Sequence, residues 1–327
     1  MIVINMTHCK GVKAPEEVVI WKGSHMSLRA WLVRRQIRKA FRPKQHKDAS
    51  PEMLGNHFIE VLGGMEKLLP PPPKDVQIEK VDENGVKGEW VSAPGARDDR
   101  IFFYNHGGGY AWGSPKAYRE MAYRFSAASQ SIVFLLDYGL SPEAKCPQQL
   151  EEGLAAYDYV VAKNPDASIT MGGDSAGGGL TLSMAHAIRD SERKQLVALA
   201  MIAPWTDLTG SGKSTTENAE KDSMLDPRGI SFAADQFRGD CAVDDPRCSP
   251  HFGSQAGLPP MILQVGQDEI LRDDAVRLAE MVEKEGGTVQ LDVWPKVHHV
   301  WHFSARIIPE GKRAIKDIGK FFEPYWG

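Results

Sequence analysis

The segment GDSAG at 173–177 fits the pattern G-x-S-x-G, with Ser175 between two glycines. It follows the apolar segment 168–172 and opens a stretch of helical character, which is the strand–turn–helix context that this pattern requires. The glycines allow the two backbones to approach closely, and the amino end of a helix favours developing negative charge. We therefore predict that Ser175 is a nucleophile, rather than a serine in a tight turn without chemistry.

A histidine and three glycines, HGGG at 106–109, directly follow the apolar segment 101–105. Attack of a serine on an ester carbonyl produces an oxyanion, which needs N–H donors already in place. We predict that the backbone N–H groups of Gly107, Gly108 and Ala176 form this oxyanion hole, and that His106 supports the loop. A phosphate-binding loop is the alternative, but neither G-x-G-x-x-G nor a Lys-Ser/Thr pair after the glycines is present.

An acid and a base should follow the serine along the chain, in the order Ser, Asp or Glu, His. After Ser175, Asp268 is the first acidic residue at the end of a predicted buried strand. Glu269 is its neighbour and could be confused with it. We predict that Asp268 orients the catalytic histidine.

Three histidines, His298, His299 and His302, follow the last predicted strand. One of them should accept the proton of Ser175 through one ring nitrogen while the acid binds the other. The pattern alone barely separates His298 from His299. A metal site is the alternative, but no carboxylate or cysteine in that loop completes a ligand set.

Short apolar segments alternate with helical segments from about residue 101 to residue 323. This alternation predicts a mostly parallel sheet covered by helices on both faces. Residues 76–91 alternate like a hairpin around Asn84-Gly85, which makes the sheet mixed. Active sites in such sheets lie at the carboxyl ends of the strands, where all the residues named above fall.

The first 70 residues contain two predicted helices, a basic one at 27–42 and a second at 51–69, which ends at four prolines, 70–73. The sequence GSHM at 23–26 looks like a cloning scar, so residues 1–25 are native or vector-derived. Helix 27–42 is either part of a lid or an anchor on a membrane surface.

The composition is that of an ordinary globular protein and argues against disorder, with 327 residues, 42% hydrophobic and 25% charged. A net charge of −4 gives no reason to expect a nucleic acid partner. We find neither a secretory signal nor an apolar run that could span a membrane, and expect a cytoplasmic protein without stable membrane insertion. The four cysteines are predicted to be unpaired thiols, with a bridge between Cys241 and Cys248 as the alternative in an oxidising compartment.

The motifs together resemble those of the hormone-sensitive-lipase-like carboxylesterases of the α/β-hydrolase superfamily. The matching segments are HGGG at 106–109, GDSAGG at 173–178, VGQDEILRDD at 265–274 and HVW at 299–301. The resemblance implies an α/β-hydrolase fold with a helical cap, and favours His299 because Val300 and Trp301 follow it. The family usually carries Arg where Gly139 stands, which does not affect the chemistry.

The resemblance also divides the chain into a cap, residues 1–70 and about 206–250, and a catalytic domain, residues 71–205 and 251–327. It implies hydrolysis of short- to medium-chain acyl esters through a Ser-His-Asp triad and an acyl-enzyme, on small-molecule substrates, without a cofactor or a metal; a homodimer stays open. Two alternatives remain: a non-catalytic ligand receptor on the same fold, and an amidase or lactonase. Candidate pocket residues are Trp31, Phe58, Leu62, Trp112 and Trp205.

Overall fold

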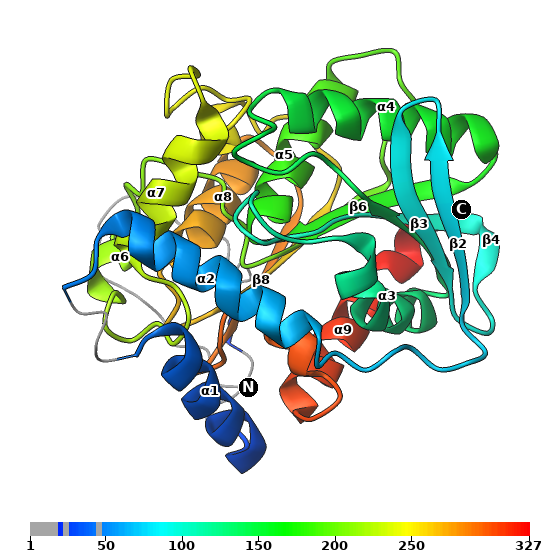
Figure 1. Ribbon diagram of the computed structural model, residues 1–327. Coiled ribbons are helices and arrows are strands. Elements are labelled where there is room, and N and C mark those ends of the chain that lie inside the picture. The colour runs from blue at the N-terminus through cyan, green and yellow to red at the C-terminus, as the bar shows by residue number, and fades with distance from the viewer. Residues whose placement is uncertain (1–18, 22–25, 44–47) are drawn as a thin grey trace.

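The computed structural model describes residues 19–21, 26–43 and 48–327. Within them, a nine-stranded sheet forms the centre, in the order β1-β9-β8-β7-β6-β4-β5-β3-β2 (Figure 1). Residues 22–25, which include most of the predicted cloning scar, lie outside this description, as do residues 1–18. The strands are β1 (Val19–Trp21), β2 (Gln77–Glu83), β3 (Val86–Ser92), β4 (Arg97–Asn105), β5 (Ser131–Leu136), β6 (Ser168–Asp174), β7 (Ala198–Ile202), β8 (Met261–Gly266) and β9 (Val289–Trp294).

Helices cover both faces of the sheet. Helices α3 and α9 pack together on one face, and α4, α5 and α8 lie on the other (Figure 1). The α-helices are α1 (Leu28–Phe41), α2 (Pro51–Glu66), α3 (Pro115–Ser129), α4 (Gln148–Lys163), α5 (Ala176–Arg189), α6 (Ser214–Glu217), α7 (Pro227–Arg238), α8 (Arg272–Lys284) and α9 (Pro309–Phe322). The short 3-10 helices are η2 (Pro250–Phe252), η3 (Trp301–Ser304) and η4 (Glu323–Tyr325).

The pairing confirms the predicted mixed, mostly parallel sheet. β3 pairs antiparallel with β2 and β5, and the other neighbours are parallel. The β2–β3 turn places Asn84 and Gly85 at φ 54° and 81°, the backbone that an Asn-Gly hairpin turn requires. β1 was not predicted, because it lies in the segment interpreted as native or vector-derived, and it pairs with the edge of β9.

The central strands are buried because they consist almost entirely of apolar residues. Every residue of β7 (ALAMI) and of β8 (MILQVG) is buried. The carboxyl ends of four parallel strands, β4, β6, β8 and β9, lead directly into the segments that carry the predicted site residues. The sheet therefore brings segments that are far apart in the sequence to one edge.

Helices α1, α2 and α7 lie beside that edge (Figure 1). α2 packs against α7 so closely that a Cβ on Gly55 would lie 2.6 Å from Cδ1 of Phe232. α1 begins at the N-cap Ser27, whose backbone N–H donates to Glu310 Oε1 at 2.6 Å. The amino-terminal helices are thus attached to the rest of the chain at two places: α2 packs on α7, and α1 is bound to the start of α9.

Candidate active site

Ser175 sits in a sharp turn between the last residue of β6 and the first of α5, with φ 53° and ψ −122°. This left-handed backbone is strained for a residue other than glycine. A Cβ on Gly173 would lie 2.3 Å from the carbonyl oxygen of Gly177, and a Cβ on Gly177 would lie 2.1 Å from that of Asn105. Both glycines are therefore required by close backbone approach, as the pattern predicted.

His299 is bound through one ring nitrogen to a buried carboxylate. Its Nδ1 lies 2.5 Å from Oε2 of Glu269, and both side chains are 2% exposed. Because a carboxylate only accepts, Nδ1 carries the proton and Nε2 of the neutral ring is an acceptor. Nε2 is buried and has no hydrogen-bond partner among the described residues. Burial lowers the pKa of His299, but the charge and hydrogen bond of Glu269 outweigh burial and the pKa lies above its usual value.

The prediction that Asp268 binds the histidine is wrong. β8 ends at Gly266, and the N–H of Glu269 donates to the carbonyl of Gly266, a turn that sends the Glu269 side chain inward. Asp268 points the other way and pairs with Arg34 of α1 at 2.7 Å. The missing side chain of Gly266 makes the room, since a Cβ there would lie 2.7 Å from Oε1 of Glu269.

The other two histidines of the loop have partners of their own. His298 Nδ1 lies 2.9 Å from the carbonyl of His299, and its Nε2 lies 2.9 Å from Oγ of Ser304. His302 donates to the side chain of Gln264 in β8 at 2.7 Å. Burial lowers the pKa of His298 to about 4 and that of His302 to about 3. Of the three, only His299 binds a carboxylate. Nδ1 of His302 is also buried without a partner among the described residues, but the other nitrogen of that ring binds a neutral amide.

The backbone N–H groups left free at the glycine loop after β4 differ in one residue from the predicted oxyanion hole. The N–H of Gly107 donates to Oη of Tyr118 (2.9 Å) and to Oδ1 of Asp174 (3.1 Å), so it is not available to a substrate oxygen. The N–H groups of Gly108, Gly109 and Ala176 have no acceptor within the described ranges. Gly108 and Gly109 adopt φ 112° and 64°, which a side chain would strain.

Asp174, the variable residue of the G-x-S-x-G pattern, fixes this loop. Its carboxylate accepts hydrogen bonds from the hydroxyls of Tyr104 (2.9 Å) and Tyr118 (3.0 Å), besides the N–H of Gly107. Burial raises its pKa to about 6, although the hydroxyls oppose the rise. The sequence analysis missed this role, for which the only signal was an acidic residue at an apolar strand end.

His106 supports the loop, as predicted from its position. Its ring stacks on Tyr138 with centroids 4.2 Å apart, and the Tyr138 hydroxyl donates to the His106 carbonyl at 2.7 Å. Its Nδ1 lies 2.8 Å from the carbonyl of Gly107. Burial lowers the pKa of His106 to about 4, so the ring is neutral near pH 7.

A cavity of about 550 Å³ opens in front of Ser175 and His299. Three of the five predicted pocket residues, Phe58, Leu62 and Trp112, line it. The predictions for Trp31 and Trp205 are wrong. Trp31 is 45% exposed on α1, where its ring lies under Arg35, and Trp205 is buried against Tyr110 behind the serine.

A second, smaller cavity of about 80 Å³ also reaches Ser175. It lies between the glycine loop, α2 and α7, and is lined by Gly109, Phe58 and Ala233 among others. Ser175 thus stands between two cavities of very unequal size.

The segment after β7 holds the loop that carries Glu269. Asn218 Nδ2 donates to the Glu269 carbonyl (2.9 Å), Asp222 accepts from the N–H of Ile270 (2.9 Å), and Ser214 Oγ donates to the carbonyl of Ile270 (2.7 Å).

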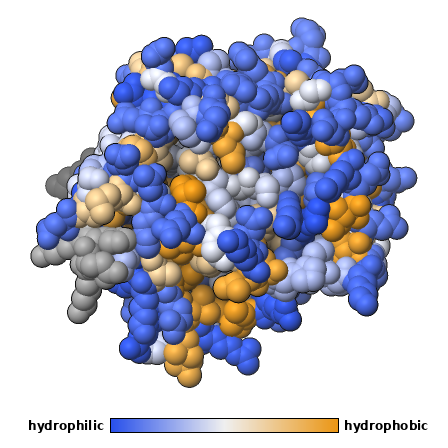
Figure 2. Space-filling view, viewed as in Figure 1, coloured by the Kyte–Doolittle hydropathy of each residue, from blue (hydrophilic) through white to orange (hydrophobic). Residues whose placement is uncertain are grey.

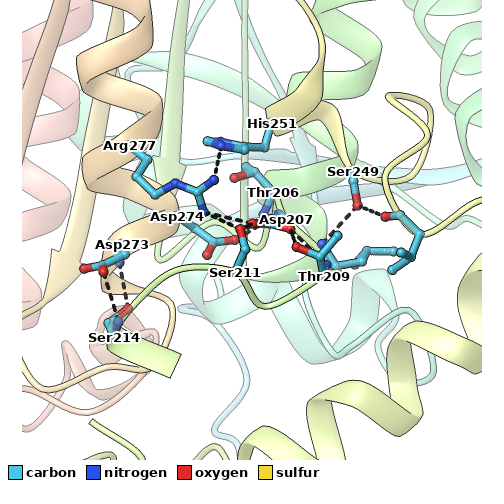
Figure 3. Close-up of polar contacts among 12 residues, drawn as sticks. Thr206, Asp207, Thr209, Ser211, Ser214, Ser249, His251, Asp273, Asp274 and Arg277 are labelled. Atoms are coloured by element: carbon cyan, nitrogen blue, oxygen red, sulfur yellow. Dashed lines mark hydrogen bonds and ion pairs between the residues drawn. The ribbon is translucent and has the colours of Figure 1, made fainter. Parts of the chain in front are cut away.

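A buried polar network anchors this segment to α8 (Figure 3). Asp274 accepts from the N–H groups of Thr206 and Asp207, at 2.8 and 3.0 Å, and Arg277 pairs with Asp207 at 2.8 Å. Burial raises the pKa of Asp274 to about 7. The network ties the end of β7 to the helix that follows Glu269.

Within residues 19–21, 26–43 and 48–327, no group of three or more His, Cys, Asp or Glu side chains is placed to hold a metal ion. Cys146, Cys241 and Cys248 are free thiols, and Cys9 lies outside the described residues. No helix in the described part of the chain is long and apolar enough to cross a membrane.

Comparison with known proteins shows which protein family this chain is similar to. Residues 102–303 match a family model described as the alpha/beta hydrolase fold. An acetyl-hydrolase of Streptomyces hygroscopicus is 35% identical over 257 residues, which cover 78% of this chain and 84% of that protein. An esterase of Acinetobacter venetianus is 29% identical over 268 residues, or 81% and 88% of the two chains.

Among solved structures, an esterase from the bacterial hormone-sensitive lipase family superposes with a TM-score of 0.83 at 36% identity. That superposition covers 93% of this chain and all of the other. The likeness therefore extends well beyond the segments that carry the motifs.

Proposed function

The chain belongs to the α/β-hydrolase-fold family, among the hormone-sensitive-lipase-like carboxylesterases, and we propose that it hydrolyses esters with Ser175 as nucleophile, His299 as base and Glu269 as the acid. The observation that carries the proposal is the state of His299. One nitrogen is bound to a buried carboxylate, and the other is buried, unpartnered and at the same cavity as Ser175. An imidazole held in this way accepts a proton from a serine hydroxyl.

In the first half of the proposed reaction, His299 Nε2 takes the proton of Ser175 as its Oγ attacks the ester carbonyl. Glu269 stabilises the imidazolium and keeps its orientation. The oxyanion accepts hydrogen bonds from the N–H groups of Gly108, Gly109 and Ala176, whose hydrogens are otherwise unused. The proton on Nε2 then passes to the departing alcohol, leaving an acyl-enzyme.

In the second half, His299 takes a proton from water, and the hydroxide attacks the acyl-enzyme. The same N–H groups stabilise the second oxyanion, and Ser175 leaves with the proton from Nε2. Besides the ester and water, the steps use only side chains and backbone amides of this chain.

The proposed substrates are small-molecule esters with short- to medium-chain acyl groups. The acetyl-hydrolase name of the Streptomyces relative supports the short end of this range. We propose that the described part of residues 1–70 (26–43 and 48–70) and residues about 206–250 act as a cap over the catalytic domain, because α2 contacts α7 and both helices line cavities at Ser175. Excluding water there strengthens the interactions of the oxyanion hole.

A panel of p-nitrophenyl esters of increasing acyl length tests the proposal, with Ser175→Ala as the matched variant. The parent protein should hydrolyse the short esters, and Ser175→Ala should lose several orders of magnitude of kcat while remaining folded by circular dichroism. A protein that binds the esters without turnover would instead be a ligand receptor. Hydrolysis of the matching anilides at comparable rates would favour an amidase.

A further inference from the structure

The two cavities at Ser175 differ in size and in their relation to the histidine. The larger, about 550 Å³, is lined by His299, Val300 and Phe303. The smaller, about 80 Å³, is lined by Gly109 and Ala233, and no described residue of the histidine loop borders it. Only the large cavity therefore gives access to the atom that must donate a proton to the leaving group.

This asymmetry has a chemical consequence. The tetrahedral carbon carries four groups: Oγ of Ser175, the oxyanion, the acyl chain and the alkoxy oxygen. The alkoxy oxygen leaves with the proton held on His299 Nε2, so the alcohol part must lie on the histidine side. The acyl chain must then point to the other side, past Gly109.

We propose that the small cavity binds the acyl group and the large cavity binds the alcohol part, so that the preferred substrates are esters of a short acyl group with a long or bulky apolar alcohol. This rests on the proposed ester hydrolysis and narrows it to a substrate class.

The walls of the small cavity limit the acyl length. It lies between α2 and α7, which approach so closely that Gly55 leaves no room for a Cβ beside Phe232. A Cβ on Gly109 would lie 3.9 Å from Cβ of Ala233, so the helix stands directly beside the oxyanion loop. Packed interiors resist expansion, and a longer acyl chain has to displace these helices.

The large cavity opens to the surface through an apolar rim. Leu32, Leu68 and Ile307 line it and are 47%, 82% and 54% exposed. Figure 2 shows apolar side chains gathered on this face between α1 and the segment before α9. A long alcohol chain can therefore extend along apolar surface to solvent, whereas the small cavity of about 80 Å³ has far less room for an acyl chain of the same length.

Two isomeric esters test the proposal: hexyl acetate and ethyl hexanoate, which share one formula and differ in the side of the carbonyl that carries the long chain. We expect kcat/KM for hexyl acetate to exceed that for ethyl hexanoate by at least about tenfold, after each is divided by its alkaline hydrolysis rate. Acid release in a pH-stat measures both. Equal values, or a preference for ethyl hexanoate, overturn the assignment while leaving ester hydrolysis intact.

Two variants locate the effect. Ala233→Leu fills the small cavity and should lower kcat/KM for ethyl butanoate at least about tenfold more than for ethyl acetate. Leu62→Trp narrows the large cavity and should lower kcat/KM for hexyl acetate more than kcat/KM for ethyl acetate. Each ratio is measured on one preparation, so a partly unfolded fraction cancels. The reverse pattern overturns the assignment, and hydrolysis of no ester by the parent protein overturns the proposed function itself.

Discussion

At the scale of single residues, the proton chemistry of the site depends on which carboxylate meets His299. Glu269 is buried and also accepts the N–H of Gly266 at 2.6 Å, so both of its oxygens are used. Asp268 is 19% exposed in a pair with Arg34. Neighbouring acids thus have different roles, one facing the proposed reaction and the other joining α1 to the loop.

Substitution of these two acids separates their roles. Glu269→Gln should lower kcat on the order of 10³-fold, because the imidazole loses its orientation and its counter-charge. Asp268→Asn should change kcat less than about fivefold, since partly exposed ion pairs contribute at most about 1 kcal/mol. Steady-state kinetics on one p-nitrophenyl ester measures both. A damaging Asp268→Asn with an active Glu269→Gln would refute the acid assignment.

The pH profile gives a second prediction at this scale. The base must be neutral, and the pKa of His299 is raised, so kcat/KM should fall as the pH drops through a value above the ordinary histidine pKa of about 6.5. In Glu269→Gln, burial remains and the negative charge is gone. The acid limb of the weakened activity should then move to lower pH, and a shift to higher pH would contradict the assignment.

Sequence reasoning selected Ser175 and His299, which line the same cavity, because each stands at a strand end in a distinctive pattern. It could not separate Asp268 from Glu269, since a turn of a few residues decides which side chain points inward. It also assigned Gly107 to the oxyanion hole, because the pattern gives three glycines but not the Asp174 carboxylate that occupies the first N–H.

At the scale of elements, three arginines at and just after α1 donate hydrogen bonds to backbone carbonyls of other segments of the chain. Arg34 donates to the carbonyls of Lys221 and Lys296, and Arg38 and Arg42 donate to carbonyls of the 219–226 segment. That segment in turn holds the acid loop through Asp222. The sequence predicted the helix and its basic character, but not these contacts, which join residues more than 170 positions apart.

Removing two of these arginines tests the link between α1 and the acid loop. The double variant Arg38→Ala/Arg42→Ala should lower the free energy of unfolding by about 1–3 kcal/mol, because the carbonyls of the 219–226 segment lose their charged donors. It should lower kcat as well. Arg35→Ala is the control, since Arg35 lies over the exposed ring of Trp31. Chemical denaturation measures the free energy of unfolding of both variants, and steady-state kinetics measures their kcat. Equal effects of the double variant and of Arg35→Ala would refute the link.

At the scale of the whole molecule, the sheet was predictable because apolar strands and helices alternate and are separated by clear turn and loop segments. The placement of α1 and α2 beside the cavity was predictable only in outline, because which face of each helix meets the cavity depends on the packing against α7. Trp31 illustrates the limit. The helix α1 lines the cavity through Leu32 and Val33, but the large aromatic side chain of Trp31 on the same helix points to solvent.

Buried carboxyls make stability depend on pH. The pKa of Asp274 is raised to about 7, so its contribution to stability is present below about 3.9, the ordinary Asp pKa, and is lost as pH rises through 7. Asp274→Asn keeps an oxygen for the N–H groups of Thr206 and Asp207 and removes the charge. Its Tm relative to the parent should therefore be higher at pH 8 than at pH 5. A difference independent of pH would contradict the raised pKa.

The central claim is that Ser175 forms a covalent intermediate, and labelling with a fluorophosphonate tests it most directly. Intact-mass and peptide mass spectrometry should find one adduct per chain, on Ser175, with esterase activity lost in proportion to labelling. Glu269→Gln should label more slowly than the parent, whereas Asp268→Asn should label at nearly the parental rate. An adduct on another residue, or full esterase activity in protein labelled at Ser175, would contradict the account.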